Sequence, residues 1–219
     1  MRINLRNIFI GNPVYKGRYH SYDWECLLGK YKSIVRKDMT VVEIGSSNSQ
    51  KTRDLAKYCG KLIGIEIDKN KIVEPRADNV EIINADWQDL SSFIAPESVD
   101  IVISSHVIEH VPDDLKALNE TYRVLKKGGC LLLITPNKTR LTRFVAELLC
   151  LRKFFIYKEH MREYADRDIF GLISKSKFTN FVYRGLLLGF HSGKFMFYFK
   201  VCPRVFRKLA NFWEVQLVK

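Results

Sequence analysis

With 219 residues, 47% of them hydrophobic, the chain can bury one substantial core, so we expect a single domain. The formal net charge of +12 is uneven, with +5 over residues 1–40, −4 over 41–135 and +11 over 136–219. No apolar run is long enough to cross a bilayer, no signal-peptide core opens the chain, and five scattered cysteines argue against a disulfide framework or a zinc site, so a cytoplasmic protein is expected.

The central region, residues 40–135, alternates short β-branched runs with polar or amphipathic segments, after a stretch over 19–37 with the apolar spacing of a helix. Near-continuous apolar runs suit strands that are covered on both faces. The alternation predicts a doubly wound parallel sheet whose ligands lie beyond the carboxyl ends of the strands. The expected strands cover 40–44, 62–67, 80–84, 99–105 and 130–135, and the expected crossover helices cover 49–60 and 112–129.

After residue 135 the pattern changes. Residues 140–155 and 166–178 have the spacing of amphipathic helices, and 181–187 and 212–219 are expected to be two further strands. Between those strands lies an aromatic and basic segment, residues 193–210, that does not belong to the core repeat.

The turn after the first expected strand suits a nucleotide-like ligand. Glu43 and Gly45 lead through Ser46 and Ser47 into a helix, whose amino terminus presents backbone N–H groups. Glu43 suits an ammonium group, which a turn that binds only pyrophosphate has no reason to supply. Taken alone, the stretch is also typical of an ordinary strand-to-helix loop rich in capping residues.

Acidic residues also follow the second and third expected strands. Glu66, with Ile67 beside it, is placed to accept both hydroxyls of a ribose, while Asp68 is expected to cap the next helix. Asp86 suits an exocyclic adenine amine, and Trp87 offers a flat apolar face beside the ring. Each pair alone is a weak signal, but their order along the chain strengthens it.

Residues 98–137 resemble the block between the fourth and fifth strands of class I S-adenosylmethionine-dependent methyltransferases. The matching pieces are Asp100, the triplet Ile108-Glu109-His110 and the run RVLKKGG at 123–129. Residues 159–178 are similar to a segment that many small-molecule and lipid-acting members place before the sixth strand. The resemblance covers about residues 38–185.

The earlier motifs fit the same family: the turn resembles its E-x-G-x-G-x-G motif and Glu66 its ribose-binding acid. The resemblance implies a Rossmann-like, doubly wound seven-stranded α/β sheet with the last strand antiparallel and helical cap segments. It also implies an enzyme that uses S-adenosyl-L-methionine and releases S-adenosyl-L-homocysteine. The cofactor-binding residues that it implies are Glu43, Gly45, Ser46, Ser47, Glu66, Ile67, Asp86, Trp87 and Ser105.

Two departures weaken the first motif, because Ser47 and Ser49 stand where the family has its second and third glycines. A Cβ and a hydroxyl at Ser47 must turn aside, narrow the pocket or bind the cofactor carboxylate. We therefore expect cofactor binding to be retained, and whether these serines weaken it stays open.

Histidines supply the candidate proton acceptors, which methyl transfer needs only when the acceptor atom carries a proton. His106 directly follows the fourth strand and is the expected catalytic residue, ahead of His110 and His160, for which packing roles are equally open. Some quinone-precursor O-methyltransferases resemble this block and bind a divalent metal there. A metal on His106, Glu109 and His110 is the minor alternative, and we expect none.

The basic carboxyl-terminal region has several open interpretations. Residues 140–158 and 193–210 suit a cap over the acceptor site or a helix resting on anionic membrane. We expect one methyltransferase domain over 1–219, with a helical segment over 1–39, a cofactor-binding core over 40–135 and cap segments with the last two strands over 136–219. The expected acceptor is a small molecule, a lipid-linked intermediate or a saccharide.

Two alternatives remain. One is an eroded, non-catalytic binding protein on the same fold. The other is an RNA methyltransferase, which the sequence SSHV after the fourth strand disfavours because base N-methylation uses a different tetrapeptide there. No recognised nucleic-acid-binding module accompanies the charge, so a nucleic-acid partner is not expected. The oligomeric state is not indicated.

Overall fold

The computed structural model describes residues 8–11, 22–46, 50–72, 77–148, 160–192, 195–199, 202 and 204–219. Its main sheet has seven strands in the order β4-β3-β2-β5-β6-β10-β7. The strands are β2 (Thr40–Ile44), β3 (Lys61–Glu66), β4 (Val80–Asn84), β5 (Val99–Ser105), β6 (Leu125–Pro136), β7 (Asn180–Leu186) and β10 (Phe212–Val218).

The strand directions confirm the predicted fold class. The pairs β2–β3, β3–β4, β2–β5 and β5–β6 are parallel, and β10 runs antiparallel to both β6 and β7. The strand order reverses between β2 and β5, which are neighbours in the sheet although β3 and β4 lie between them in the chain. Ligands of doubly wound sheets bind at such a switch point, beyond the carboxyl ends of the strands.

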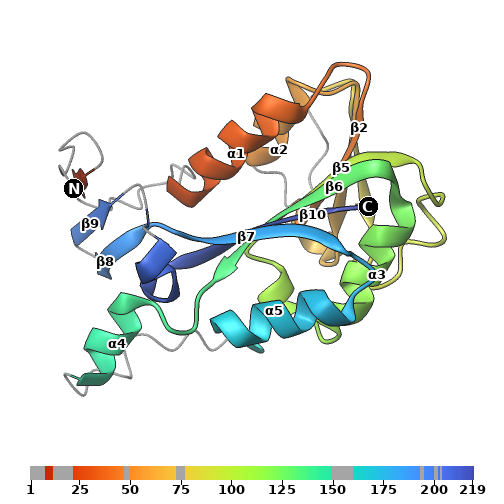
Figure 1. The fold of residues 1–219 in the computed structure, drawn as a ribbon. Coiled ribbons are helices and arrows are strands. Elements are labelled where there is room, and N and C mark those ends of the chain that lie inside the picture. The colour runs from red at the N-terminus through yellow and green to blue at the C-terminus, as the bar shows by residue number, and fades with distance from the viewer. Residues whose placement is uncertain are drawn as a thin grey trace.

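Helices cover both faces of this sheet (Figure 1), which explains why the central strands β2, β3, β5 and β6 are buried on both sides. Helices α1 (Tyr22–Ile34) and α2 (Gln50–Ala56) cover one face, and α1 buries Trp24, Leu27 and Tyr31 there. Helices α3 (Asp114–Val124) and α5 (Asp166–Lys175) cover the other face. The structure confirms the expected helices before, within and after the core, with α2 and α3 shorter than predicted. Residues 125–129, expected at the end of the second crossover helix, instead begin β6.

Capping explains where the short elements begin. The Asp113 carboxylate accepts a hydrogen bond from the Lys116 N–H at 2.9 Å and so caps α3. Asp68 caps the 3₁₀ helix η2 (Lys69–Lys71) in the same way, as predicted. A further 3₁₀ turn, η3 (Ile108–His110), connects β5 to α3.

A second, three-stranded sheet lies beside the main one, in the order β1 (Ile8–Gly11), β9 (Phe195–Phe199) and β8 (Leu188–Ser192) (Figure 1). The expectation of a helix in 193–210 was wrong where the chain is described. Residues 195–199 form a strand, and only η5 (Arg204–Leu209) is helical, as a 3₁₀ turn. The run FMFYF is aromatic, favours strands and pairs antiparallel with both neighbours.

Helix α4 (Leu141–Leu148) accounts for the first half of the helix expected over 140–155, and the rest of that range includes residues outside the described ones. The Thr142 hydroxyl donates a hydrogen bond to the Gly189 carbonyl at 3.2 Å, so α4 contacts β8. Since α4 follows β6 and β8 follows β7, the second sheet and α4 extend from the edge where ligands bind. In the described part of the chain, no helix has both the length and the apolar character to cross a membrane.

Candidate active site

The turn after β2 lies at the switch point. Ile44 pairs with Ser104 of β5, so the chain leaves the sheet after these two neighbouring strands at Gly45 and His106. Gly45 has φ of +78°, and a Cβ at this position would lie 2.6 Å from Val107 Cγ2. Both the conformation and the close contact require glycine.

Glu43 lies beneath this turn and is buried. Burial raises the pKa of Glu43 to about 7, although hydrogen bonds from Thr52 and Ser46 and the nearby charge of Lys51 act in the opposite direction. Glu43 Oε2 has no hydrogen-bond partner among the described residues. An acid with an unpaired buried oxygen is suited to bind a cationic group from a ligand.

Of the three serines in the motif, the structure describes only Ser46. Ser46 is fully buried, and its hydroxyl packs against the backbone of Gly64 and lies 3.4 Å from the Thr52 hydroxyl. Its N–H donates to the Ile65 carbonyl at 3.1 Å, so Ser46 faces the protein and not the ligand edge, contrary to the expectation. Ser47 and Ser49 lie outside the described residues.

The predicted ribose-binding residue lies at the end of β3. Glu66 is its last residue and is mostly buried, and one carboxylate oxygen accepts the Asp68 N–H at 2.9 Å. Ile67, directly after the strand, is 69% exposed. A fixed carboxylate beside an exposed apolar side chain suits a polar sugar next to a flat ring.

The end of β4 differs from the expectation at one residue. Trp87 is only 3% exposed, and its Nε1–H donates to the Thr121 hydroxyl at 2.9 Å, so the ring belongs to the core beneath α3 and offers no open face. Asp86 is half-buried, and its carboxylate accepts hydrogen bonds from the Gln88 backbone and side chain at 2.8–3.1 Å. Of this pair, only Asp86 remains available for an adenine.

His106 follows β5 at the same edge and adopts φ of +58°, which is uncommon for a residue with a Cβ. Its N–H donates to the Ile134 carbonyl at 2.9 Å, which anchors the backbone. The ring lies between two carboxylates, with Nε2 2.6 Å from Asp23 Oδ2 and Nδ1 3.4 Å from Glu109 Oε1. The ring of Phe212 packs edge-to-face against it at 5.1 Å between centroids.

This environment determines the charge of His106. Burial alone lowers its pKa, but hydrogen bonds and charges from Asp23 and Glu109 outweigh burial and raise the pKa to about 9. The imidazole is therefore cationic at neutral pH and accepts a proton only when the pH approaches 9. Its side chain is 30% exposed, so part of the ring faces outward.

Glu109, His110 and His160 bring ligand-type atoms within 4.8 Å of one another. Glu163 Oε1 lies 3.2 Å from His160 Nδ1, which orients that ring. His106, which the metal alternative included, is not part of this group. The alternative therefore does not describe the cluster that the structure forms, and we assign no metal to it.

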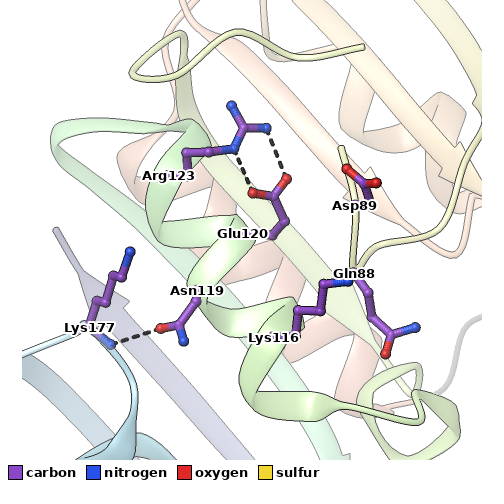
Figure 2. Close-up of a pocket in the computed structure, with 7 residues that line it drawn as sticks. All are labelled: Gln88, Asp89, Lys116, Asn119, Glu120, Arg123 and Lys177. Atoms are coloured by element: carbon purple, nitrogen blue, oxygen red, sulfur yellow. Dashed lines mark hydrogen bonds and ion pairs between the residues drawn. The ribbon is translucent and has the colours of Figure 1, made fainter. Parts of the chain in front are cut away.

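A surface hollow of about 310 Å³ lies elsewhere, along α3 (Figure 2). The Glu120 carboxylate accepts two hydrogen bonds from Arg123, and Asn119 accepts the Lys177 N–H. The residues that line the hollow are Gln88, Asp89, Lys116, Asn119, Glu120, Arg123 and Lys177. None of them was expected at the site, and we assign no function to this hollow.

Comparisons with known proteins agree with this geometry. Residues 42–133 match a family described as "Methyltransferase domain". A probable S-adenosylmethionine-dependent methyltransferase of Mycolicibacterium smegmatis is 31% identical over 100 residues, which are 45% of this chain and 38% of that protein. This chain carries a class I S-adenosylmethionine-dependent methyltransferase domain.

Other relatives of the methyltransferase domain include the human mitochondrial ubiquinone biosynthesis O-methyltransferase. It is 31% identical over 113 residues, which are 48% of this chain and 30% of that protein. The chain thus matches well under half the length of these two relatives. A Thermotoga maritima structure, described as a possible histamine N-methyltransferase, shares the fold with a TM-score of 0.63 at 22% identity and covers 90% of this chain and 89% of its own.

In the methyltransferase domain, several of the residues that the structure describes are suited to bind S-adenosylmethionine. Glu43 presents an unpaired buried oxygen, Gly45 leaves a turn without a side chain, and Ser105 has a buried hydroxyl with no hydrogen-bond partner among the described residues. With Glu66 and Ile67 on the neighbouring strand, these groups lie at the carboxyl ends of β2, β3 and β5. The fit is thus supported on three adjacent strands.

Sequence reasoning missed two residues of this edge in the methyltransferase domain. Asp23 of α1 is 3% exposed and reaches His106, although it precedes the core by 17 residues of chain. Lys51 of α2 lies over the Trp24 ring, 4.8 Å from its centroid, and burial lowers the pKa of its ammonium group. The apolar spacing over 19–37 predicts a helix, but no pattern distinguishes Asp23 from an exposed acid in a first helical turn.

Proposed function

We propose that this chain transfers the methyl group of S-adenosylmethionine to a small-molecule acceptor. The observation that carries the proposal is the convergence of Glu43, Gly45 and His106 at the switch point between β2 and β5, with Glu66 on the adjacent strand. The cofactor supplies an alkylating methyl group on a sulfonium, so the protein mainly has to align the acceptor and exclude water.

Different residues of the chain would bind different parts of S-adenosylmethionine. Glu43 holds the ammonium of the methionine moiety, Gly45 allows backbone to approach it, and Glu66 accepts the ribose hydroxyls. Asp86 is placed for the adenine amine. The role of Ser47, in the same motif, stays a prediction.

His106 is the proposed catalytic residue. It lies where the acceptor would approach. When the ring is neutral, as the pH approaches 9, Nδ1 takes the proton that an acceptor hydroxyl or amine loses. The relatives support an acceptor of small size, because one is named for ubiquinone biosynthesis and a fold relative for possible histamine methylation. An O or N acceptor atom fits a histidine proton acceptor better than a carbon atom does.

The experiment is equilibrium binding of S-adenosylhomocysteine by calorimetry, followed by transfer of tritium from methyl-labelled S-adenosylmethionine to a panel of phenols and amines. Glu66→Ala should weaken S-adenosylhomocysteine binding about tenfold to a hundredfold, since it removes hydrogen bonds to a charged acceptor. Glu81→Ala is the matched control, because Glu81 is an exposed acid on neighbouring β4. Absence of binding at millimolar ligand contradicts the proposal and favours an eroded binding protein.

Peripheral membrane contact stays a separate prediction. Phe144 and Leu148 on α4 and Val205 and Phe206 on η5 are exposed, and η5 is basic. Such surfaces bind anionic bilayers through apolar insertion and charge. Co-sedimentation with phosphatidylserine vesicles, compared with phosphatidylcholine vesicles, tests the contact. If the same amount of protein stays in both supernatants, the contact is contradicted.

A further inference from the structure

Asp23 lies outside the segment that matches the methyltransferase family, yet it makes the shortest contact of His106 that the structure describes. Its Oδ2 lies 2.6 Å from His106 Nε2, and its side chain is 4% exposed. The contact joins α1 to the end of β5, two parts of the chain separated by 83 positions. A buried carboxylate this close to an imidazole fixes both the orientation of the ring and the nitrogen that carries the proton.

The support of Asp23 is rigid. Its neighbour Trp24 and Leu27 on the same helix are fully buried against the sheet. One turn farther, the Lys30 ammonium donates to the buried Glu214 carboxylate of β10 at 3.0 Å. Helix α1 is therefore fastened to the sheet at two levels, and Asp23 is held in place by packing and not by its own contact alone.

We propose that Asp23 is a positioning residue of the methyl-transfer site, which holds His106 by Nε2 so that Nδ1 is the atom that takes the acceptor's proton. This inference rests on the proposed function and adds a residue to it. In the neutral ring the Nε2–H donates to Asp23, and Nδ1 carries the lone pair. The acceptor's proton moves to Nδ1, and its electron pair stays on the acceptor atom.

Glu109 completes the arrangement. Glu109 Oε1, which is fully buried and has no hydrogen-bond partner among the described residues, lies 3.4 Å from Nδ1, so its negative charge stabilises the imidazolium that forms when Nδ1 takes a proton. The elements packed against the ring contribute Asp23 from α1, Glu109 from η3 and the uncharged ring of Phe212 from β10. The pKa of His106 therefore depends on these two acids.

The test follows the imidazole of His106 by NMR in the whole protein labelled with ¹⁵N-histidine, with the signal assigned through His106→Gln. In the unsubstituted protein the titration midpoint should lie near pH 9, and at higher pH the neutral ring should carry its proton on Nε2. In Asp23→Asn the midpoint should fall by about one to three pH units, because one opposite charge is lost. Glu25→Gln, an exposed acid on the same helix turn, should leave it unchanged.

Catalysis separates positioning from a merely structural ion pair. With an acceptor from the panel, the rate of the unsubstituted protein should rise with pH up to about 9. In Asp23→Asn this rise should move to lower pH with the His106 midpoint, and the maximal rate should fall at least about tenfold. A structural role alone lowers stability and leaves the position of the rise unchanged.

Binding separates this inference from the proposed function. If the unsubstituted protein shows no binding of S-adenosylhomocysteine, the proposed function is contradicted. Normal binding together with a midpoint at or below 6.5, or with a neutral ring protonated on Nδ1, overturns the role of Asp23, and this measurement needs no variant that might fold poorly. Asp23→Glu, which keeps the charge but changes its reach, should retain the raised midpoint and still lower the rate.

Discussion

At Gly45 a single hydrogen in place of a side chain decides whether the chain can turn at the edge of the sheet. The positive φ excludes most residues, and the Val107 methyl group occupies the space that a Cβ needs. Gly128 has the same φ of +78° but nothing within 4 Å of its virtual Cβ. This pair separates backbone strain from steric contact.

Gly45→Ala should destabilise the protein by about 2–4 kcal/mol and reduce S-adenosylhomocysteine binding, since strain and displacement of Val107 add together. Gly128→Ala should lower the free energy of unfolding by about 1 kcal/mol, with binding unchanged. Urea denaturation and calorimetry measure both quantities. Equal effects of the two substitutions on stability and binding would show that the Val107 contact is unimportant.

The Glu43 carboxyl should make cofactor affinity depend on pH near neutrality. Its pKa is raised to about 7, so it is largely neutral below this pH and charged above it. An ammonium ligand favours the charged form, so S-adenosylhomocysteine should bind more tightly as pH rises from 6 to 8. In Glu43→Gln this rise should disappear, as calorimetry at several pH values can show, and a persisting rise assigns the effect to another group.

The same raised pKa affects folding with the opposite sign. An acid whose pKa is higher in the folded state resists ionisation there, so the contribution of Glu43 to stability is lost as pH rises from its ordinary value of 4.5 to about 7. Above that range the loss is constant. The site therefore combines a less stable apo protein with tighter binding of a cationic ligand.

At the scale of elements, the contact between the loop after β4 and α3 explains why Trp87 is not a ligand platform. The indole nitrogen bonds the Thr121 hydroxyl, which in turn donates to the Ala117 carbonyl one turn earlier in α3. The loop is thus fastened to the helix, and the ring fills the core that both share. This arrangement joins two crossover connections on one face of the sheet.

Thr121→Val should lower the free energy of unfolding by about 1–3 kcal/mol, because it leaves the buried Trp87 N–H without a partner. Its effect on S-adenosylhomocysteine affinity should be less than about twofold, since neither residue faces the ligand edge. Thermal unfolding and calorimetry test this. Trp87→Phe is the companion variant, and weaker cofactor binding in it with unchanged stability would restore the adenine-platform hypothesis.

At the scale of the whole molecule, a buried acid joins the helical layer to the last two strands. Glu214 of β10 is 1% exposed and bonds Lys30 of α1 at 3.0 Å and Arg184 of β7 at 2.7 Å. Both cations are more exposed than the acid, so the two ion pairs link a buried strand residue to side chains at the surface. Helix α1, which presents Asp23, depends on this connection.

Glu214→Gln should lower the free energy of unfolding by about 1–3 kcal/mol, because two charge-assisted hydrogen bonds are weakened while both cations can regain water. Glu97→Gln should change it by less than about 1 kcal/mol, since the Glu97–Lys219 pair is half exposed on the acid side. Denaturant titrations compare the two variants. Equal losses would show that the Glu214 connection has no special weight.

The sequence by itself determined the sheet, because apolar runs of strand length at crossover spacing leave few other folds for residues 40–136. It also placed Glu43, Gly45, Glu66 and Asp86 near the carboxyl ends of their strands. Because these strands are parallel, their carboxyl ends share one edge of the sheet. Such patterns record periodicity and position along a strand, and these properties are local.

Only the tertiary structure decided which side chains turn toward that edge. Trp87 turns into the core because Thr121 lies beneath it, and Ser46 turns inward because Gly64 leaves room for it. Asp23 meets His106 because α1 packs across the sheet, and residues 195–199 become a strand because β1 and β8 pair with them. Contacts between distant segments depend on packing, and no local pattern in the chain records them.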